Sequence, residues 1–347
     1  MKALVMKEVN RLQVEECAVP GIQENGDAIV RVTTAGICGS DLHIVQGRDP
    51  GIRMNTIMGH EFVGTIEEVG TDVRNFRTGD RVLSPFSINC GNCFYCRREL
   101  PARCIHSFAF GFVNEEGKGL QGAQAEFVRV PFSSSTLVKI PDDLADEDVL
   151  FLGDIFSTAY SCAENASIRE GDVVAIIGCG PVGLLSVIAA KLFHPAAIVA
   201  IDVVRYRLEK AESFGALAVS PENAMAQIRR LTEGRGADAC LEAVGNPAAL
   251  DLAIELSRPG AIISIAGYHT EAHYSLPINR AYGKNLTFKI GRCNARKYID
   301  RLLPLVRQQN LPLRQIITHV LPLPDAVKGY DIFAGRKESA IKVLLKT

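Results

Sequence analysis

Short apolar runs separated by turn-forming residues characterise the first 140 positions of the chain. Two of these runs, at 28–32 and 64–69, are rich in the β-branched residues that favour strands. Clusters of Asn, Asp and Gly at 24–27 and 78–80 indicate turns. The pattern therefore predicts a mostly β region at the start of the chain.

After Pro141 the pattern changes to short, fully apolar strands that alternate with helical segments. Six strands are predicted, at 172–177, 198–202, 217–219, 238–243, 261–266 and 286–290. Most are separated by helical segments such as 205–214 and 247–257. Apolar strands joined by helices are typical of a parallel sheet covered on both faces. The expected fold is thus α/β, with a doubly wound, six-stranded parallel sheet next to a mostly β domain.

The segment after residue 290 does not extend this parallel sheet. It contains one predicted helix at 295–309, several prolines and a final strand at 340–345. We expect this tail to return to the β-rich domain. Two domains are predicted. The first consists of 1–152 and 291–347 and includes a small lobe at 88–106, and the second is 153–290.

Composition and charge exclude several classes of protein. The chain has 347 residues, more than one hydrophobic core commonly serves, which agrees with two domains. Its 38 basic and 39 acidic residues include no basic run, so we expect no nucleic-acid partner. The longest apolar stretch, 182–190, is far shorter than the roughly 20 residues of a membrane span. Polar residues at 7 and 8 interrupt any signal peptide, so a cytoplasmic location without membrane partners is predicted.

Cysteines are the first candidates for chemistry. A reducing cytoplasm keeps thiols free, so ten cysteines need an explanation other than disulfides. Five isolated cysteines are predicted to be small buried side chains: Cys17, Cys162, Cys179, Cys240 and Cys293. Four further cysteines are clustered within 15 residues: Cys90, Cys93, Cys96 and Cys104. Four thiols so close together predict a closed, tetrahedral, structural zinc site, with an iron–sulfur cluster as the alternative.

A glycine-rich turn predicts a dinucleotide site. The segment Gly178-Cys179-Gly180-Pro181-Val182-Gly183 follows a predicted strand and opens a predicted helix. The first glycine of such a turn allows its tight bend, the second allows a pyrophosphate to approach, and the third allows close helix packing. The amides at the helix start favour an anion.

Asp202 predicts which dinucleotide binds. It stands 19 residues after Gly183 at the end of the next strand, where a carboxylate accepts from the ribose hydroxyls of NAD and repels the extra phosphate of NADP. Arg205 and Arg207 lie just beyond and offer that phosphate a partner. NAD is the predicted cofactor, with Arg207 among its contacts.

Three further segments carry a family resemblance. They are Gly36-Ile37-Cys38-Gly39-Ser40-Asp41, Gly59-His60-Glu61 and Gly153-Asp154-Ile155-Phe156-Ser157-Thr158. Together with the cysteine loop and the glycine-rich turn, in this order, they resemble the zinc-dependent medium-chain dehydrogenase/reductase family, the zinc-containing alcohol dehydrogenases, over essentially the whole chain. The resemblance implies a GroES-like catalytic domain at 1–152 and 291–347 and an NAD-binding Rossmann domain at 153–290.

The resemblance also implies a catalytic zinc held by Cys38, His60 and Asp154, with the fourth position open to substrate. Asp154 stands where many relatives have a second cysteine. Its segment and the stretch 121–141 are most similar to members acting on formaldehyde and small secondary alcohols. Taken singly, Cys38 fits a core residue, His60 a structural histidine and Asp154 a helix cap.

Other roles follow from the same resemblance. Ser40 and His43 are expected to pass on the proton of the alcohol, and Glu61 to be a second-shell carboxylate or a transient fourth ligand. Lys342 matches a pyrophosphate contact only loosely, and a solvated surface lysine is the alternative. The residues expected to contact the nicotinamide are Thr158, Val244, Gly267 and Tyr268. The remaining candidates for the substrate pocket are Phe86, Phe108 and Phe110.

The predicted function is reversible hydride transfer between NAD(H) and a small alcohol or its aldehyde or ketone, with one catalytic and one structural zinc per chain. The alternatives are a polyol or threonine-type dehydrogenase, a formaldehyde dehydrogenase or dismutase, and a non-catalytic protein that binds zinc and dinucleotide. By family analogy we expect a homo-oligomer, a tetramer or a dimer.

Overall fold

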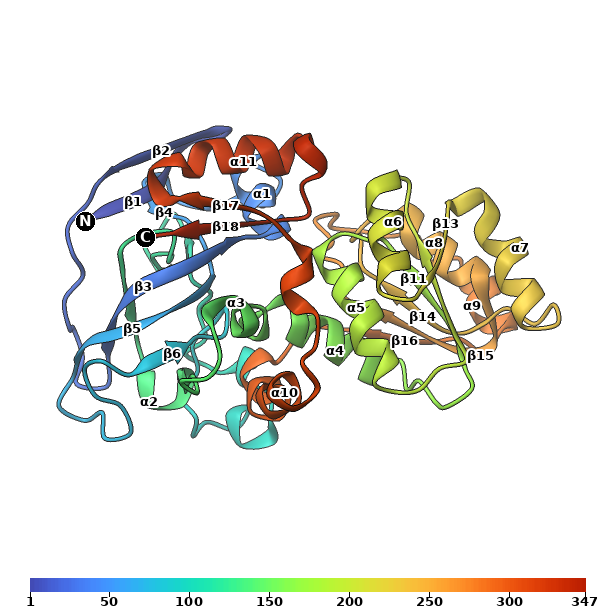
Figure 1. Ribbon diagram of the computed structural model, residues 1–347, viewed down its shortest axis with the longest axis horizontal. Helices are drawn as coiled ribbons and strands as arrows, with labels where there is room; N and C mark the ends of the chain where they lie inside the picture. Colours follow the sequence, from blue (N-terminus) through green and yellow to red (C-terminus); the bar gives the residue numbers. More distant parts are fainter. The chain divides into compact units, whose positions relative to one another are not determined.

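The structure, a computed structural model, describes residues 1–347 and separates into two units, each with its own internal contacts. The first unit consists of Met1–Ser157 and Asn294–Thr347, and the second of Thr158–Cys293. Both chain termini therefore lie in the first unit (Figure 1). None of the helices is long and apolar enough to span a membrane.

A six-stranded sheet forms the centre of the second unit. Its strand order is β13-β12-β11-β14-β15-β16, and every pair of neighbours is parallel. The strands are β11 (Val173–Ile177), β12 (Ala197–Ile201), β13 (Leu217–Val219), β14 (Ala237–Glu242), β15 (Ser257–Ile265) and β16 (Thr287–Ile290). All six strands were predicted, although β15 begins four residues earlier than expected. The predicted α/β class and parallel sheet are confirmed.

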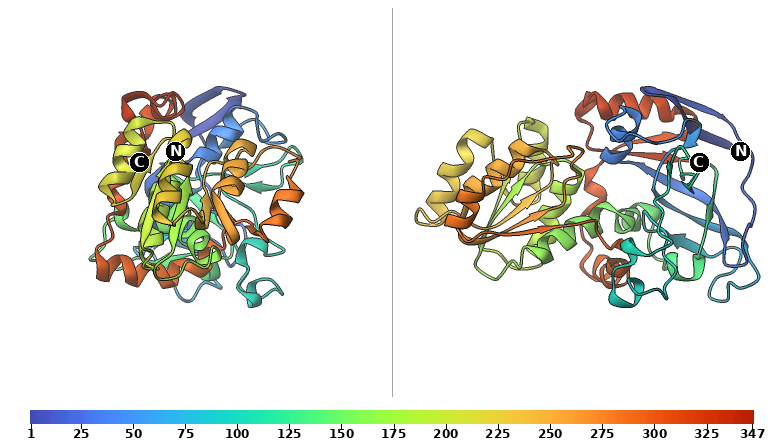
Figure 2. Two further views of the ribbon diagram at one scale, coloured as in Figure 1. Left: turned by 90° about the vertical axis from the view of Figure 1, so that its right-hand side faces the viewer. Right: turned by 180° about the vertical axis from the view of Figure 1, so that it is seen from behind.

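Helices cover both faces of this sheet (Figure 2). The helices in this part of the chain are α4 (Ile155–Asn165), α5 (Pro181–Lys191), α6 (Arg205–Ser213), α7 (Pro221–Leu231), α8 (Pro247–Leu256) and α9 (Ile278–Gly283), and α5 to α8 pack on the sheet strands. Helices α5 and α6 pack on each other, as do α7 and α8. Strand β11 is buried at every position, which explains its continuous apolar sequence. The strand order reverses between the neighbouring strands β11 and β14, and ligands bind at this position in such sheets.

The first unit is mostly β. A three-stranded sheet, β2-β1-β4, contains β1 (Lys2–Glu8), β2 (Arg11–Glu16) and β4 (Thr56–Ile57). A seven-stranded sheet has the order β10-β6-β5-β3-β18-β17, with β9 also pairing with β3. Its strands are β3 (Ala28–Ile37), β5 (Glu61–Val69), β6 (Arg81–Leu83), β9 (Phe127–Val130), β10 (Val138–Lys139), β17 (Ile317–Pro322) and β18 (Lys342–Lys346). The pair β7 (Phe112–Val113) and β8 (Gly119–Leu120) forms a small hairpin.

The helices of the first unit are few and mostly short. They are α1 (Gly39–Val45), α2 (Ser133–Thr136), α3 (Asp146–Val149), α10 (Ala295–Gln309) and α11 (Ala326–Ala334). Helix α11 contributes Tyr330 and Phe333 to a core that also contains Ile37 of β3 and Val343 of β18. Burial of apolar side chains from segments so far apart in the sequence fixes the ends of the chain to the β-rich unit.

The tail confirms one prediction and corrects another. Strand β18 pairs antiparallel with β3, so the tail returns to the β-rich unit as expected. The prediction of a single helix after residue 290 was wrong, because α11 and strand β17 also form. Pro322 and Pro324 come just before α11, where a fixed proline backbone is compatible with the start of a helix.

Candidate functional site

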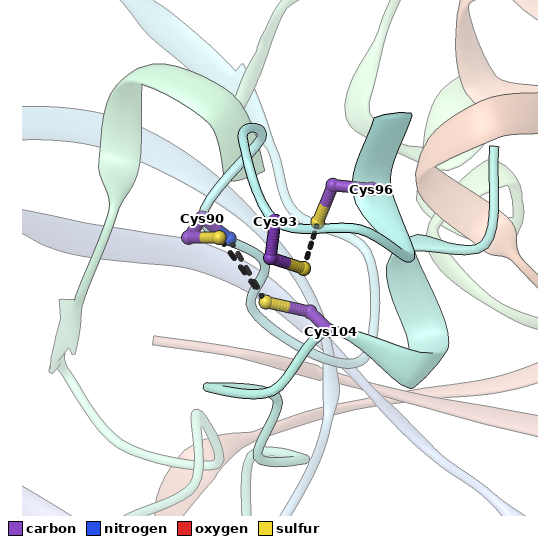
Figure 3. Close-up of side chains that lie close together, drawn as sticks. All are labelled: Cys90, Cys93, Cys96 and Cys104. Atoms are coloured by element: carbon purple, nitrogen blue, oxygen red, sulfur yellow. Dashed lines mark hydrogen bonds between the residues drawn. The ribbon is translucent and has the colours of Figure 1, made fainter. Parts of the chain in front are cut away.

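The four clustered cysteines belong to one loop, and their side chains converge on one point (Figure 3). Two 3₁₀ turns, η1 (Cys96–Arg98) and η2 (Pro101–Arg103), bend the loop so that its two ends meet. The sulfur atoms of Cys93 and Cys96 are 3.5 Å apart, as are those of Cys90 and Cys104. All four sulfur atoms lie within 4.8 Å of one another.

This arrangement fits a metal ion. A tetrahedral zinc with sulfur bonds of about 2.3 Å separates its ligands by about 3.8 Å, close to the spacing in the loop. The backbone N–H groups of Cys90 and His106 donate to the Cys104 sulfur at 3.3 and 3.4 Å. Amides of Cys96 and Ile105 lower the pKa of Cys93 to about 6, whereas burial raises the pKa of Cys96 to about 12. A bound cation would favour the thiolate form of all four.

A second cluster is assembled from three distant segments of the first unit. Cys38 follows the end of β3 and precedes α1, while His60 directly precedes β5. Asp154 follows the 3₁₀ turn η3 (Leu150–Gly153) and precedes α4. The Asp154 Oδ2 atom lies 3.2 Å from His60 Nε2 and 3.8 Å from the Cys38 sulfur. The predicted ligand set therefore comes together in space.

The second cluster also fits a metal ion. Zinc bonds of about 2.0–2.3 Å hold mixed sulfur, nitrogen and oxygen ligands about 3.3–3.5 Å apart in a tetrahedron. Burial raises the pKa of the Cys38 thiol, and the Glu61 carboxylate adds to this effect. Burial alone would lower the pKa of His60, but the carboxylates of Asp41 and Asp154 raise it well above its usual value. Without a cation these groups favour their protonated forms, and a cation reverses that preference.

Asp41 orients His60 and was not among the predicted site residues. Its Oδ1 atom lies 3.1 Å from His60 Nδ1, which leaves Nε2 directed at Asp154. Its Oδ2 atom accepts from the backbone N–H of Cys38 at 2.9 Å. One buried carboxylate thus fixes two of the three predicted ligands, a common arrangement around metal-binding histidines. The sequence feature that could have revealed Asp41 is an acidic residue in the first turn of the helix after Cys38.

Ser40 lies at the cluster, as the proton-transfer prediction requires. Its hydroxyl is 3.4 Å from the Cys38 sulfur and 3.3 Å from His60 Nε2. His43 is half-buried on the same helix, α1. Its role in a proton relay stays a prediction.

Lys342 corrects the surface interpretation. Its side chain is fully buried, and its ammonium group lies 2.7 Å from the Glu61 carboxylate, which is also fully buried. Burial alone would lower the pKa of Lys342, but the Glu61 charge raises it. Glu61 passes so close to Gly36 that a Cβ there would lie 2.3 Å from its Oε2 atom. Glu61 belongs to the metal-competent group of side chains, and the buried lysine balances its charge.

The glycine-rich turn has the geometry that its sequence predicts. Gly178 has a φ of 91° directly after β11, and α5 begins at Pro181 with Gly180 as its N-cap. A Cβ on Gly183 would lie 1.8 Å from the Gly178 carbonyl oxygen. Only glycine permits this close packing of helix against turn.

Asp202 joins the glycine-rich turn to the end of β12. Its carboxylate accepts from the backbone N–H of Cys179 at 2.6 Å and of Val204 at 2.8 Å. Each oxygen keeps a second lone pair for a ligand hydroxyl. The Arg207 guanidinium lies beside Gly180, with an Nη1 atom 3.9 Å from where a Cβ would stand.

Two turns meet at the carboxyl ends of β14 and β15. Glu242, fully buried, accepts from the backbone N–H groups of Val244 and Gly245 at 2.7 and 2.8 Å and lies 3.1 Å from His269 Nε2. A Cβ on Gly267 would lie 2.2 Å from the Gly245 nitrogen. Glu242 was missed because a buried acid inside an apolar strand carries no motif.

The predicted nicotinamide contacts differ in exposure. Val244 and Tyr268 are 44% and 46% exposed, so both present side-chain surface at this edge of the sheet. Thr158 is half-buried on α4. Their roles stay predictions.

Some of the pocket and cysteine expectations need correction. Phe110 is fully buried and packs edge-on against Phe62 in the core of the first unit, so it is not a pocket residue. Phe86 is also buried, whereas Phe108 is 42% exposed. Among the isolated cysteines, Cys17 is only half-buried, and the other four are buried as predicted.

Comparison with known proteins identifies the family. Residues 24–142 match the alcohol dehydrogenase GroES-like domain, and residues 181–308 match the zinc-binding dehydrogenase domain. The fold and its two clusters are thus those of a two-domain oxidoreductase. The chain belongs to the zinc-containing medium-chain alcohol dehydrogenase family.

Individual relatives span essentially the whole chain. Zinc-type alcohol dehydrogenase B of Aspergillus flavus is 38% identical, covering 100% of this chain and 81% of the relative. An alcohol dehydrogenase of Cupriavidus necator is 34% identical over 100% of this chain and 98% of its own length. The structure of an alcohol dehydrogenase from Thermus sp. ATN1 matches with a TM-score of 0.94 and 42% identity, covering 100% of this chain and 99% of that one.

Proposed function

We propose that this chain is a cytoplasmic, zinc-dependent alcohol dehydrogenase that transfers hydride reversibly between NAD(H) and a small alcohol or the matching aldehyde or ketone. One observation carries the proposal. Cys38, His60 and Asp154 bring a thiol, an imidazole and a carboxylate within metal-binding distance, with the Ser40 hydroxyl beside them. A site that only stabilises the fold does not need a hydroxyl for proton transfer.

The two clusters have different proposed roles. Cys38, His60 and Asp154 would hold the catalytic zinc, which supplies the Lewis acidity that makes an alcohol proton easier to remove. The four-cysteine loop would hold a structural zinc, because four thiolates leave no position for substrate. The carboxylate of Asp154 has the same charge as a thiolate but donates less electron density, which strengthens that Lewis acidity.

Proton movement is assigned to side chains of α1. Ser40 relays the alcohol proton: its hydroxyl oxygen accepts that proton and its own hydroxyl proton is passed on, because the hydroxyl both donates and accepts and lies at the cluster. His43, on the same helix, passes the proton to water, since imidazole titrates near neutral pH. Glu61 stays paired with Lys342 near the ligands, and Lys342 balances its charge.

NAD is the proposed cofactor. The amides at the start of α5 and the glycines of the turn would bind its pyrophosphate, and the Asp202 carboxylate its ribose. Thr158, Val244, Gly267 and Tyr268 are the proposed contacts of the nicotinamide. A comparison of kcat/KM with NAD and NADP tests this part, and a clear advantage for NADP would overturn it.

The decisive experiment combines turnover with metal counting. Metal-replete protein is given NAD with primary alcohols, secondary alcohols, polyols, threonine and hydrated formaldehyde, and NADH is followed by absorbance. Zinc per chain is counted in the same samples. We expect turnover of small primary or secondary alcohols and about two zinc ions per chain, one for each cluster.

Two variants complete that experiment. Asp154→Ala should lose activity and about one of the two zinc ions. The control, Asp331→Ala, changes an exposed acid on α11 and should keep both. If only polyols or threonine turn over, the small-alcohol assignment is wrong. If no NADH forms with any substrate while zinc and NAD are both bound, the small-alcohol dehydrogenase assignment is wrong, and a dismutase or a non-catalytic protein takes its place.

A further inference from the structure

The side chain of Gln124 contacts the segments that carry Cys38 and His60. Its Nε2 group donates to the Gly36 carbonyl oxygen at 3.0 Å and to Asp41 Oδ2 at 3.3 Å. Gly36 lies two residues before Cys38, and Asp41 orients His60. Gln124 itself is fully buried, so no water replaces these hydrogen bonds.

Gln124 is also packed tightly against the His60 segment. Gly59, which precedes His60 and has a φ of 94°, would place a Cβ only 2.4 Å from the Gln124 Cγ atom. The backbone N–H of Gln124 donates to the Met58 carbonyl oxygen at 2.8 Å. The amide therefore cannot shift without moving the segment that leads to His60.

Tyr330 determines which way the Gln124 amide faces. Its hydroxyl donates to Gln124 Oε1 at 2.8 Å from helix α11, and the ring is buried. Burial and the nearby Asp41 carboxylate raise the pKa of Tyr330 well above its usual value, so the hydroxyl keeps the proton that it donates. With the amide reversed, Oε1 would face the Gly36 carbonyl and the Asp41 carboxylate, and oxygen would oppose oxygen.

We propose that Gln124 and Tyr330 are positioning residues that hold Asp41, and through it His60, in the orientation that binds metal at the Cys38–His60–Asp154 cluster. This inference rests on the proposed function, because it assumes that the cluster binds zinc. Hydrogen-bond partners of a metal-binding histidine commonly change metal affinity by 10- to 100-fold. Gln124 and Tyr330 lie one and two hydrogen bonds beyond Asp41, so their effects should be smaller and should decrease in that order.

The test measures metal binding and not turnover. Gln124→Met keeps the length of the side chain and removes its donors, and Tyr330→Phe removes only the hydroxyl. Zinc dissociation constants are measured by chelator competition, and visible spectra are recorded with cobalt in place of zinc. We expect the dissociation constant of the Cys38–His60–Asp154 cluster to rise about fivefold in Gln124→Met and about twofold in Tyr330→Phe, with shifted cobalt bands in both.

Two controls separate positioning from general destabilisation. The four-cysteine loop is an internal control, since its zinc affinity should not change in either variant. Ser133→Ala removes a buried hydroxyl that donates to the Gly26 carbonyl oxygen at 3.0 Å, and it should leave both zinc affinities unchanged.

The outcomes distinguish this inference from the function on which it rests. If the unaltered protein binds zinc at both clusters but the two variants bind it with unchanged affinity and unchanged cobalt bands, only the positioning role is overturned. Equal weakening at both clusters also overturns it. If the unaltered protein binds no zinc at the Cys38–His60–Asp154 cluster, the proposed function fails as well.

Discussion

The two metal-competent clusters of the first unit are built in opposite ways. The four cysteines belong to one loop, and Cys90 and Cys104 are only 14 residues apart. Cys38 and Asp154 are 116 residues apart and meet only because β3 and η3 pack in the same unit. The first cluster therefore depends on a local loop, whereas the second depends on the whole folded unit.

This difference explains what surrounds each cluster. The cysteine loop has aromatic and arginine side chains but little core, and Phe94 is 58% exposed. The dispersed cluster lies among buried polar groups, including Asp41, Gln124 and the Glu61–Lys342 pair. A metal would thus stabilise the loop itself, while at the dispersed cluster the fold organises the ligands before the metal arrives.

Loss of the loop metal should produce the largest change in stability. In Cys96→Ala we expect zinc to fall by about one ion per chain and the free energy of unfolding to fall by more than about 4 kcal/mol, because the loop has little other core. Urea unfolding followed by circular dichroism measures this change. Cys17→Ala, outside both clusters, should stay within about 1 kcal/mol of the unaltered protein. A fully stable Cys96→Ala protein would contradict a structural role for the loop.

Loss of a dispersed ligand should reverse this pattern. In Cys38→Ala we expect kcat/KM to fall by more than about 100-fold. Changes to residues that only contact a metal ligand reduce activity by at most about 100-fold, and loss of the ligand itself should cost more. The free energy of unfolding should fall less than in Cys96→Ala, because the surrounding core and hydrogen bonds remain. Turnover and urea unfolding of both variants provide the comparison. Equal losses of stability would show that the two clusters support the fold alike.

Glu242 offers a test that leaves both metal clusters intact. In Glu242→Gln one carbonyl oxygen must replace two carboxylate oxygens that serve Val244, Gly245 and His269. We expect the NADH dissociation constant to rise about tenfold, or about 1.4 kcal/mol, with unchanged zinc content. The chain has no tryptophan, so NADH fluorescence reports binding directly. Glu222→Gln, an exposed acid on α7, is the control, and an equal effect there would refute this role of Glu242.

The sequence predicts what is local and periodic. The six parallel strands, the glycine-rich turn and the cysteine loop each depend on residues close together in the chain, and all three form as expected. The three dispersed ligands could be predicted only through family resemblance, because nothing in their spacing brings Cys38 to Asp154.

The contacts that sequence reasoning missed join residues far apart in the chain. Tyr330 is 206 residues from Gln124, and Lys342 is 281 residues from Glu61. Lys342 lies in an apolar strand that was predicted correctly, yet the strand pattern could not show that its partner is a buried carboxylate on β5. Such pairs are consequences of tertiary packing, and no local pattern records them.

The smallest expected effect concerns the segment that leads to Asp154. Three consecutive acids begin α3, and each pairs with a base from another element: Asp146 with Arg81, Glu147 with Lys346, and Asp148 with Arg314. Burial alone would raise the pKa of Asp146, but hydrogen bonds from Thr33 and Arg81 lower it. This carboxylate therefore helps to anchor the segment in its ionised form.

Asp146→Asn should remove this contribution in a pH-dependent way. Because the folded pKa lies below the unfolded value of about 3.9, the stabilisation is fully present above that value and is lost as the pH falls through the folded pKa. We expect a loss of about 1 kcal/mol at pH 7 that disappears in strong acid, where the unaltered carboxyl is also protonated. Urea unfolding of both proteins from pH 7 downward measures the difference. Asp143→Asn breaks a solvent-exposed pair with Arg307 and should show no comparable loss, so equal losses would assign the effect to surface charge and not to the anchoring of α3.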